Sequence, residues 1–236
     1  MCRYTFPLLL FFSSWLASMA HGQQLSFGIK SVGGLAGAPL KVPYYKTNYK
    51  VLVIPASLLG GAVRWQINHK YALVSELLLS RKGGAFEGIG LLEATPSKIT
   101  VWVSYLNMPV GIFYQSKRFF AGAGVYAGIA LKGDLEREKT IHWPASGVTE
   151  VFNFDSSLPF NKDQDGTYAS YVRRFDYGIK AELGYDLKGY RASIYCEQGL
   201  ANAIPRLDGQ SSIFRNRVLA VSFACFFRDL NKKVVN

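Results

Sequence analysis

The sequence contains little cysteine, little histidine and little charge. Only three of its 236 residues are cysteines, and three are histidines. Cys2 lies at the very start of the chain, while Cys196 and Cys225 fall among apolar residues, so we predict neither a disulfide framework nor a metal centre. Charged residues make up 18% of the chain against 49% hydrophobic residues, a low charged share for a soluble secreted protein.

Long apolar runs are absent beyond the N-terminal segment. No later stretch approaches the roughly 18 uncharged apolar residues that a membrane-spanning helix needs. The N-terminal segment has one positive charge at Arg3, then an apolar run, then small residues at Ala20 and Gly22. This three-part form predicts a secretory signal peptide over residues 1–22, cleaved before Gln23.

Polar and apolar residues alternate over long stretches. In RRFDYGIKAELGYDL, residues 173–187, one parity holds aromatic and aliphatic side chains, and the other holds charges and glycines. Because successive strand side chains point to opposite faces, this pattern predicts a long strand between two different surroundings. Segments of this kind are predicted at 24–34, 55–67, 71–82, 99–115, 118–132, 173–186, 190–200 and 214–227.

Short and long connections alternate along these segments. The short ones are 68–70, 116–117 and 187–189, and the long ones are 35–54, 83–98, 133–172 and 201–213. Outer-membrane barrels have short periplasmic turns, long external loops and strands of about 9 to 11 residues across the bilayer. We therefore predict an all-β fold, an eight-stranded antiparallel up-and-down transmembrane β-barrel over 23–227, with a short periplasmic tail at 228–236.

The polar parity gives the predicted interior. Charges enclosed in a barrel must be paired, and eight strands leave room only for side chains, so we expect an interior charge network and no open pore. Glycines on the same parity, including Gly122 and Gly178, are expected to make room for long side chains. The predicted network is Lys30, Arg64, Glu76, Asp176, Lys180, Glu182, Arg191 and Glu197.

Aromatic residues flank the short turns. Amphipathic rings are favoured at a membrane interface, so we predict a ring of aromatics at this end of the barrel. Its members are Trp65, Tyr71, Tyr114, Phe119, Tyr185, Tyr190 and Phe227. Pro109 removes a donor from the strand ladder, and a bulge is expected there.

Taken in order, several stretches resemble the PorT-like outer-membrane β-barrel family. They are LSFGIKSVGGL, YALVSELLLSRKGG, YLNMPVGIFY, FFAGAGVYAGIAL, FDYGIKAELGYDL and NRVLAVSFACFF. The resemblance implies an eight-stranded barrel in the outer membrane of a Gram-negative bacterium, with no assigned activity in most members. It also implies an alternative role as an accessory subunit of a protein secretion or assembly machine. The chain departs from the family pattern in the residues RDLNKKVVN that follow Phe227.

Motifs for chemistry are weak. NKDQDG, residues 161–166, begins like a calcium loop, but Val172 stands where the loop needs a glutamate. The glycines of AGAGVYAG precede no helix that could bind a phosphate. His142 and Ser146 have no fixed mutual geometry. We expect no enzyme, no metal and no cofactor.

The net charge of +11 indicates an anionic partner. For an exported chain without a Lys/Arg-rich run, lipid head groups or polysaccharide are favoured over nucleic acid. We expect a monomer that contacts outer-membrane lipid and has a structural or loop-mediated binding role. Surface polysaccharide and a secretion-machinery protein are the further candidate partners, and KVPYYKTNYK, residues 41–50, is the first candidate contact. A soluble lipid-binding barrel is the remaining alternative.

Overall fold

The computed structural model describes residues 24–41, 50–89, 96–143, 147–160, 170–187, 189–207 and 210–227. The predicted signal peptide, most of residues 41–50, the NKDQDG stretch, Ser146 and the tail lie outside these residues. Within them, all the named elements are strands. No helix in these residues is long and apolar enough to span a membrane.

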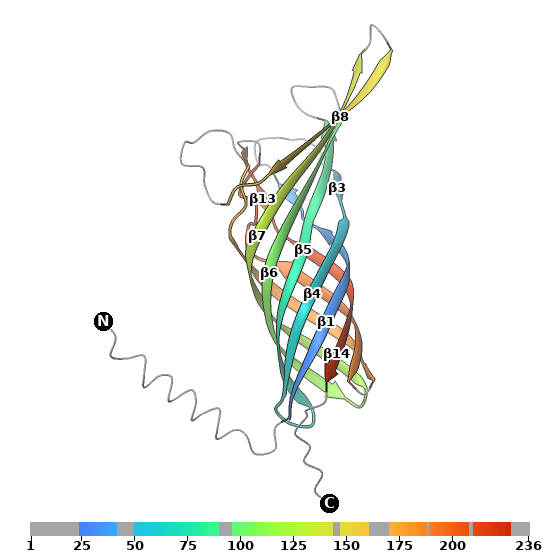
Figure 1. Ribbon diagram of the computed structural model, residues 1–236, viewed down its shortest axis with the longest axis vertical. Coiled ribbons are helices and arrows are strands. Elements are labelled where there is room, and N and C mark those ends of the chain that lie inside the picture. Colours follow the sequence, from blue (N-terminus) through green and yellow to red (C-terminus); the bar gives the residue numbers. More distant parts are fainter. Residues whose placement is uncertain are drawn as a thin grey trace, which may run out of the picture.

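Eight long strands form a closed wall (Figure 1). They are β1 (Gln24–Gly37), β4 (Ile54–Gln66), β5 (Tyr71–Ile89), β6 (Pro96–Ser116), β7 (Phe119–Trp143), β9 (Phe175–Leu187), β10 (Tyr190–Gly199) and β14 (Arg217–Phe227). All neighbours pair antiparallel, and β1 pairs with β14 from Phe27↔Phe227 to Gly37↔Arg217, which closes the ring. The predicted fold, an all-β eight-stranded antiparallel up-and-down barrel, is confirmed.

Three tight turns join β4 to β5, β6 to β7 and β9 to β10 at the end where β1 begins and β14 ends (Figure 1). In the first turn, the Asn68 side-chain oxygen accepts hydrogen bonds from the backbone N–H groups of Lys70 and Tyr71, both at 2.9 Å. In the third, Gly189 has a φ of 98°, a conformation that glycine adopts without steric cost. These turns lie where the sequence predicts them.

The predicted loops contain more strand than expected. Residues 83–89, 96–98 and 133–143 continue β5, β6 and β7, and β8 (Val148–Ser157) pairs with β7 beyond the barrel. The assignment of 83–98 and 133–172 wholly to loops is therefore wrong. The consecutive charges of 136–139 and the glycines of 83–89 resemble loops in composition, but a paired neighbour supplies the backbone hydrogen bonds that make these segments strands.

Short strands complete the external end. β2 (Leu40–Lys41) pairs with β13 (Ile213–Phe214), β3 (Lys50–Leu52) pairs with β5, and β11 (Arg206–Leu207) pairs with β12 (Gln210–Ser211). The sequence predicts only loops here, because two or three residues are too few to show an alternating pattern.

The prediction of a bulge at Pro109 is wrong. Pro109 stays in register opposite Tyr126 of β7. On its other side, the β5–β6 ladder omits two pairs between Ser75↔Val110 and Leu78↔Asn107 and resumes in the same register. The missing donor of proline is thus accommodated by a local gap in the ladder and not by an inserted residue.

The bulge lies instead on β7, close to where the external sheet begins. Ser104 pairs with Lys132 and the next residue, Tyr105, pairs with Ala130, so Leu131 is the extra residue. Leu131 and Lys132 are both exposed, and burial then resumes at Gly133 and Leu135. The inserted residue therefore reverses which parity of β7 faces inward.

Glycines inside the wall lie beneath rings from the neighbouring strand. A Cβ added to Gly122 would lie 2.2 Å from the Phe113 ring, and one added to Gly178 would lie 2.6 Å from the Tyr126 ring. Neither position can hold a larger residue without moving its ring. The glycines therefore give the interior rings their room, as the sequence predicts.

Candidate functional site: the closed interior and the external sheet

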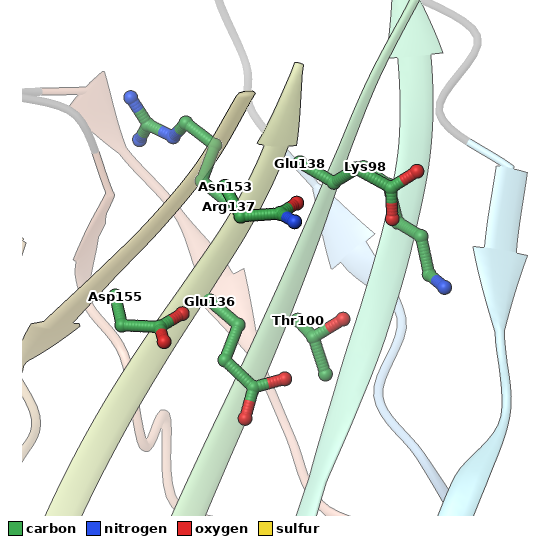
Figure 2. A pocket seen from close by; sticks show the side chains of 7 residues that line it. All are labelled: Lys98, Thr100, Glu136, Arg137, Glu138, Asn153 and Asp155. Carbon is green, nitrogen blue, oxygen red and sulfur yellow. The ribbon is translucent and has the colours of Figure 1, made fainter. Parts of the chain in front are cut away.

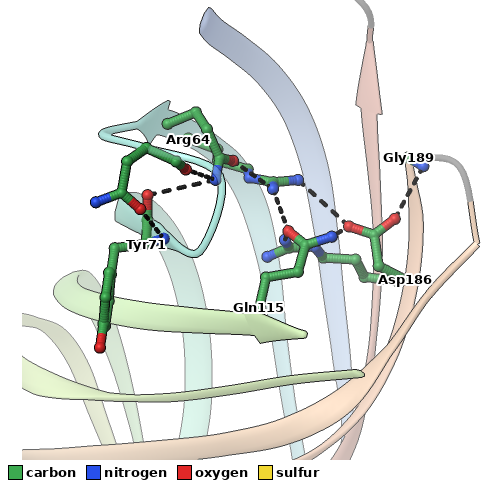
Figure 3. Close-up of polar contacts among 8 residues, drawn as sticks. Arg64, Tyr71, Gln115, Asp186 and Gly189 are labelled. Atoms are coloured by element: carbon green, nitrogen blue, oxygen red, sulfur yellow. Dashed lines mark hydrogen bonds and ion pairs between the residues drawn. The ribbon is translucent and has the colours of Figure 1, made fainter. Parts of the chain in front are cut away.

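A first polar layer lies inside the barrel at the turn end (Figure 3). Asp186 of β9 is its centre: Oδ2 accepts Arg191 Nε at 2.9 Å and Arg64 Nη1 at 3.3 Å. Its second oxygen accepts the Gly189 backbone N–H at 3.1 Å. Arg64 also donates to the Gln115 side-chain oxygen. The carboxylate thus joins β4, β9 and β10 across the barrel.

A second layer lies halfway along the barrel. Lys30 of β1 binds Glu76 at 3.0 Å and Glu182 at 2.7 Å, and Lys180 binds Glu76 at 2.8 Å. Ser193 donates to the other Glu182 oxygen at 2.6 Å. All five side chains are buried. Cations and anions therefore alternate across the barrel and link opposite walls, and none of these charges is exposed to water.

A third layer lies nearer the external mouth. Lys82 of β5 contacts Asp176 at 3.1 Å and also pairs with Glu197. The Tyr126 hydroxyl donates to Asp176 at 3.3 Å, and the Tyr195 hydroxyl donates to Glu197 at 2.9 Å. Lys82 itself is 0% exposed, so its charge depends entirely on these partners.

The structure places all the predicted interior charges inside the wall and adds two that the sequence analysis missed. Lys82 and Asp186 belong to the network, and each has the parity of the charges already assigned on its strand. Each is the last residue of a predicted strand, where the alternating pattern gives the weakest indication of which face a side chain occupies. With them, the described interior holds five cations against five anions: Lys30, Arg64, Lys82, Lys180 and Arg191, with Glu76, Asp176, Glu182, Asp186 and Glu197.

Apolar side chains fill the mouth above the charged layers. Residues from β5 and β6, such as Phe86 and Val103, pack against Ile204 and Phe214 of the segment between β10 and β14. That segment is fixed to the wall and to itself by backbone hydrogen bonds, including Ala203 N–H to Phe214 O at 2.8 Å. Side chains thus occupy the described interior from the turns to the mouth, and this arrangement leaves no evident channel.

The predicted interface aromatics lie on the outer surface around the turn end. Tyr71 and Tyr114 face each other across β5 and β6 with ring centroids 5.5 Å apart, and Phe119 meets Tyr185 edge to face at 4.8 Å. Tyr190 and Phe227 are exposed, and Trp65 is half-buried. The same outer surface carries exposed aliphatic side chains farther along the wall, such as Ile112, Ile179 and Leu219.

Beyond the mouth, β6, β7 and β8 form an external sheet (Figures 1 and 2). All residues of β8 are exposed. A cavity of about 290 Å³ in this sheet is lined by polar side chains: Lys98, Thr100, Glu136, Arg137, Glu138, Asn153 and Asp155. Glu136 lies directly opposite Asp155 in the ladder, as Thr100 lies opposite Glu136.

The opposite parity of the external sheet combines cations with rings. Arg137 lies opposite Phe154, and Lys139 lies opposite Phe152. The two rings stack with centroids 6.5 Å apart and an interplanar angle of 18°. Both rings are exposed, so they lie on this face beside the two cations.

The described residues contain no group of three His, Cys, Asp or Glu side chains that could hold a metal ion. His69 lies exposed in the first turn, and the side chain of His142 lies outside the described residues. Cys196 and Cys225 are free thiols on the outward parity of β10 and β14.

An apolar outer surface around a sealed, charged interior defines a transmembrane β-barrel, because only closed barrels and helices satisfy their backbone within lipid. Residues 22–204 match the family described as outer membrane protein beta-barrel domain. The chain belongs to this family. It is a protein of the outer membrane of Gram-negative bacteria, and the predicted location is confirmed.

Several solved structures are similar to the chain at low identity. Ail of Yersinia pestis, in a complex with the heparin analogue sucrose octasulfate, is 10% identical, with 86% of this chain and 99% of that chain covered and a TM-score of 0.38. Neisserial surface protein A is 6% identical over 85% and 97%, with a TM-score of 0.38. OprG from Pseudomonas aeruginosa is 13% identical over 87% and 98%, with a TM-score of 0.35. A comparison with curated proteins finds no match.

Proposed function

We propose that this protein is a closed outer-membrane barrel that binds a ligand outside the cell through its external sheet and conducts no solute through its interior. The observation that carries the proposal is the β7–β8 hairpin, which extends past the wall and is exposed along the whole of β8. Beyond Leu135, which is buried in the apolar cluster at the mouth, this strand pair covers no core. Its stacked rings and cations are therefore best explained by a ligand.

The chemistry of this surface favours an anionic polysaccharide. Phe152 and Phe154 are 37% and 56% exposed and present flat apolar faces, to which the C–H faces of sugar rings can pack. Arg137 and Lys139, directly opposite in the ladder, add positive charge for carboxylate or sulfate groups. The predicted contact at residues 41–50 stays a prediction, since most of it lies outside the described residues.

The sealed interior supports the second half of the proposal. A diffusing solute would have to displace three layers of ion pairs and an apolar plug. Breaking one buried ion pair costs several kcal/mol, roughly 3 to 5, and these pairs are linked to one another. The interior is thus better suited to holding the wall rigid than to transport.

The closer resemblance to PorT-like barrels stays a prediction, and so does the alternative role as an accessory subunit of a secretion or assembly machine. The absence of enzymatic activity and a monomeric state are likewise proposals. Purification in a mild detergent separates these roles: a stoichiometric protein partner would support the accessory subunit, and a barrel that purifies alone would support the binding role.

Binding to dextran sulfate, with neutral dextran as reference, tests the external surface. We expect Phe152→Ala combined with Phe154→Ala to weaken binding about tenfold, because two exposed stacking faces of roughly 0.5 to 1.5 kcal/mol each are lost. Val151→Ala is the matched control, since Val151 is 55% exposed on the same strand with the opposite parity. Undiminished binding by the double variant, or an equal loss in the control, would refute the proposal.

A further inference from the structure

A row of polar side chains crosses the outer surface where the apolar wall ends. Arg81 of β5 pairs with Ser104 of β6, and Ser104 pairs with Lys132 of β7. These three strands lie side by side in Figure 1. All three residues have outward parity, so their side chains lie on one face. Adjacent strands are about 4.8 Å apart, which puts the Arg81 and Lys132 backbones roughly 10 Å apart, within joint reach of one small anion.

This row lies at the expected height of the outer leaflet's head groups. The next outward row toward the turns is Leu79, Leu106 and Ile129, which is entirely apolar. Arg81 lies ten residues beyond the interface residue Tyr71 on the same strand. At about 3.3 Å per residue and a tilt of about 40°, that distance corresponds to roughly 25 Å along the barrel axis, the thickness of the apolar band.

The bulge on β7 supplies the second cation of the row. If Leu131 were paired in the ordinary register and formed no bulge, Lys132 would have the parity of buried Ala130 and Tyr126 and would point into the barrel. The bulge instead exposes Leu131 and Lys132 consecutively on the outer face. Leu131 can therefore contact acyl chains, and Lys132, the next residue, can contact head groups. Bulges commonly redirect a side chain in this way.

Neighbouring residues hold both cations in position. The Arg81 guanidinium lies over the Trp102 ring, 4.5 Å from its centroid, and Trp102 is a bulky amphipathic ring of the kind favoured at interfaces. Lys132 contacts Asp134 at 2.9 Å and stays 67% exposed. In the described residues Arg81 has no carboxylate partner, so the row keeps a net positive charge after Asp134 is counted.

We infer that Arg81, Ser104 and Lys132, with Trp102 beneath the guanidinium, form a binding site for a phosphate group of the anionic glycolipid in the outer leaflet. Charge complementarity and height select this occupant: phosphates of lipid A lie at the border between acyl chains and sugars, where the row lies. Arginine and lysine donate to phosphate through charge-assisted hydrogen bonds, and Ser104 offers a neutral donor between them. The site is separate from the external sheet's proposed ligand surface.

The test measures binding of diphosphoryl lipid A to the purified full-length protein in a non-ionic detergent by native mass spectrometry. We expect Arg81→Gln combined with Lys132→Gln to weaken binding at least roughly tenfold, since one or two charge-assisted hydrogen bonds are lost. Asp134→Asn is expected to tighten binding, because it frees Lys132 from its carboxylate. Lys70→Gln, at an exposed turn position of the opposite end, removes the same kind of charge and should have no effect.

Heat-modifiable gel mobility confirms that each variant is folded. Arg81 and Lys132 are both exposed, and if the double variant does not fold, Lys132→Gln alone serves. The inference is overturned if the double variant binds diphosphoryl lipid A normally or if Lys70→Gln loses as much. It is also overturned if dephosphorylated lipid A or phosphatidylglycerol binds as well as diphosphoryl lipid A. Dextran sulfate binding should stay unchanged in the double variant, which distinguishes this site from the proposed ligand surface.

Discussion

The two halves of β7 show how one strand serves two surroundings. From Phe119 to Leu131 its outward residues are apolar, such as Val125 and Ile129, and its inward side holds glycines and rings. From Lys132 to Trp143 the outward residues are mostly charged, and apolar Leu135 is buried. The halves differ by one inserted residue. A bulge can thus reverse which residues of a barrel strand face inward, and the alternation continues on either side of it.

The barrel interior and the external sheet that these halves join also differ in what stabilises them. The interior is held by buried ion pairs between other strands, whereas the external sheet has charges in contact with water, where ion pairs contribute little. Substitutions of charge should therefore have large effects in the first and small ones in the second.

The largest expected effect is at Glu76, which bridges Lys30 and Lys180. Glu76→Ala leaves two buried cations without their shared partner and should destabilise the barrel by about 3 to 5 kcal/mol. Urea unfolding in lipid vesicles measures this change. Glu138→Ala in the external sheet is the control and should change stability by less than about 0.5 kcal/mol. Similar losses in the two variants would remove the contrast between the halves.

A smaller effect is expected at the turn-end aromatics. Phe119→Ala removes an edge-to-face contact with Tyr185 and an exposed ring at the interface. We expect a loss of about 0.5 to 1.5 kcal/mol beyond that of lost area, in the same unfolding measurement. This additional loss should vanish when Tyr185→Ala is already present in the same vesicles, and an additional loss that persists undiminished would contradict a pairwise ring contact.

The smallest expected effect has the opposite sign. Asp155 lies opposite Glu136 in the external ladder, and like charges at such positions repel. Asp155→Asn should stabilise the β7–β8 hairpin by a few tenths of a kcal/mol, and the gain should shrink as salt is added. Hydrogen exchange of the β8 amides, compared at low and high salt, measures it. Slower exchange at low salt is expected, and faster exchange would show that Asp155 stabilises the hairpin.

Parity allowed most of the wall and the interior to be predicted from the sequence. Lys180 and Ile179, adjacent in the chain, have opposite exposures of 3% and 50% because alternation survives over the whole of β9. A single insertion escapes such reasoning: nothing in LKGDLEREKTIHW, residues 131–143, marks Leu131 as the residue after which parity reverses. Lys82 is not predicted as an interior charge because it is the last residue of the predicted strand 71–82, although its pairing with Glu197 spans the barrel.

Cross-barrel contacts explain the remaining errors. The plug between β10 and β14 has no regular period, and its position depends on Ile204 and Phe214 meeting residues from distant strands. Pro109 was expected to force an insertion, whereas the ladder tolerates two missing pairs because the rest of a long strand keeps the register. Such outcomes depend on neighbours that a local pattern does not contain.

The pairing of β1 with β14 joins residues that are 180 to 200 positions apart, from Gly37 with Arg217 to Phe27 with Phe227. Until the last strand arrives, both β1 and β10 have unsatisfied edges, and an apolar surface made for acyl chains has nothing to cover it. Closure of the barrel therefore waits until β14 is available to pair with β1. Before β14 pairs with β1, the exposed strand edges and the uncovered apolar surface make this chain most prone to aggregate.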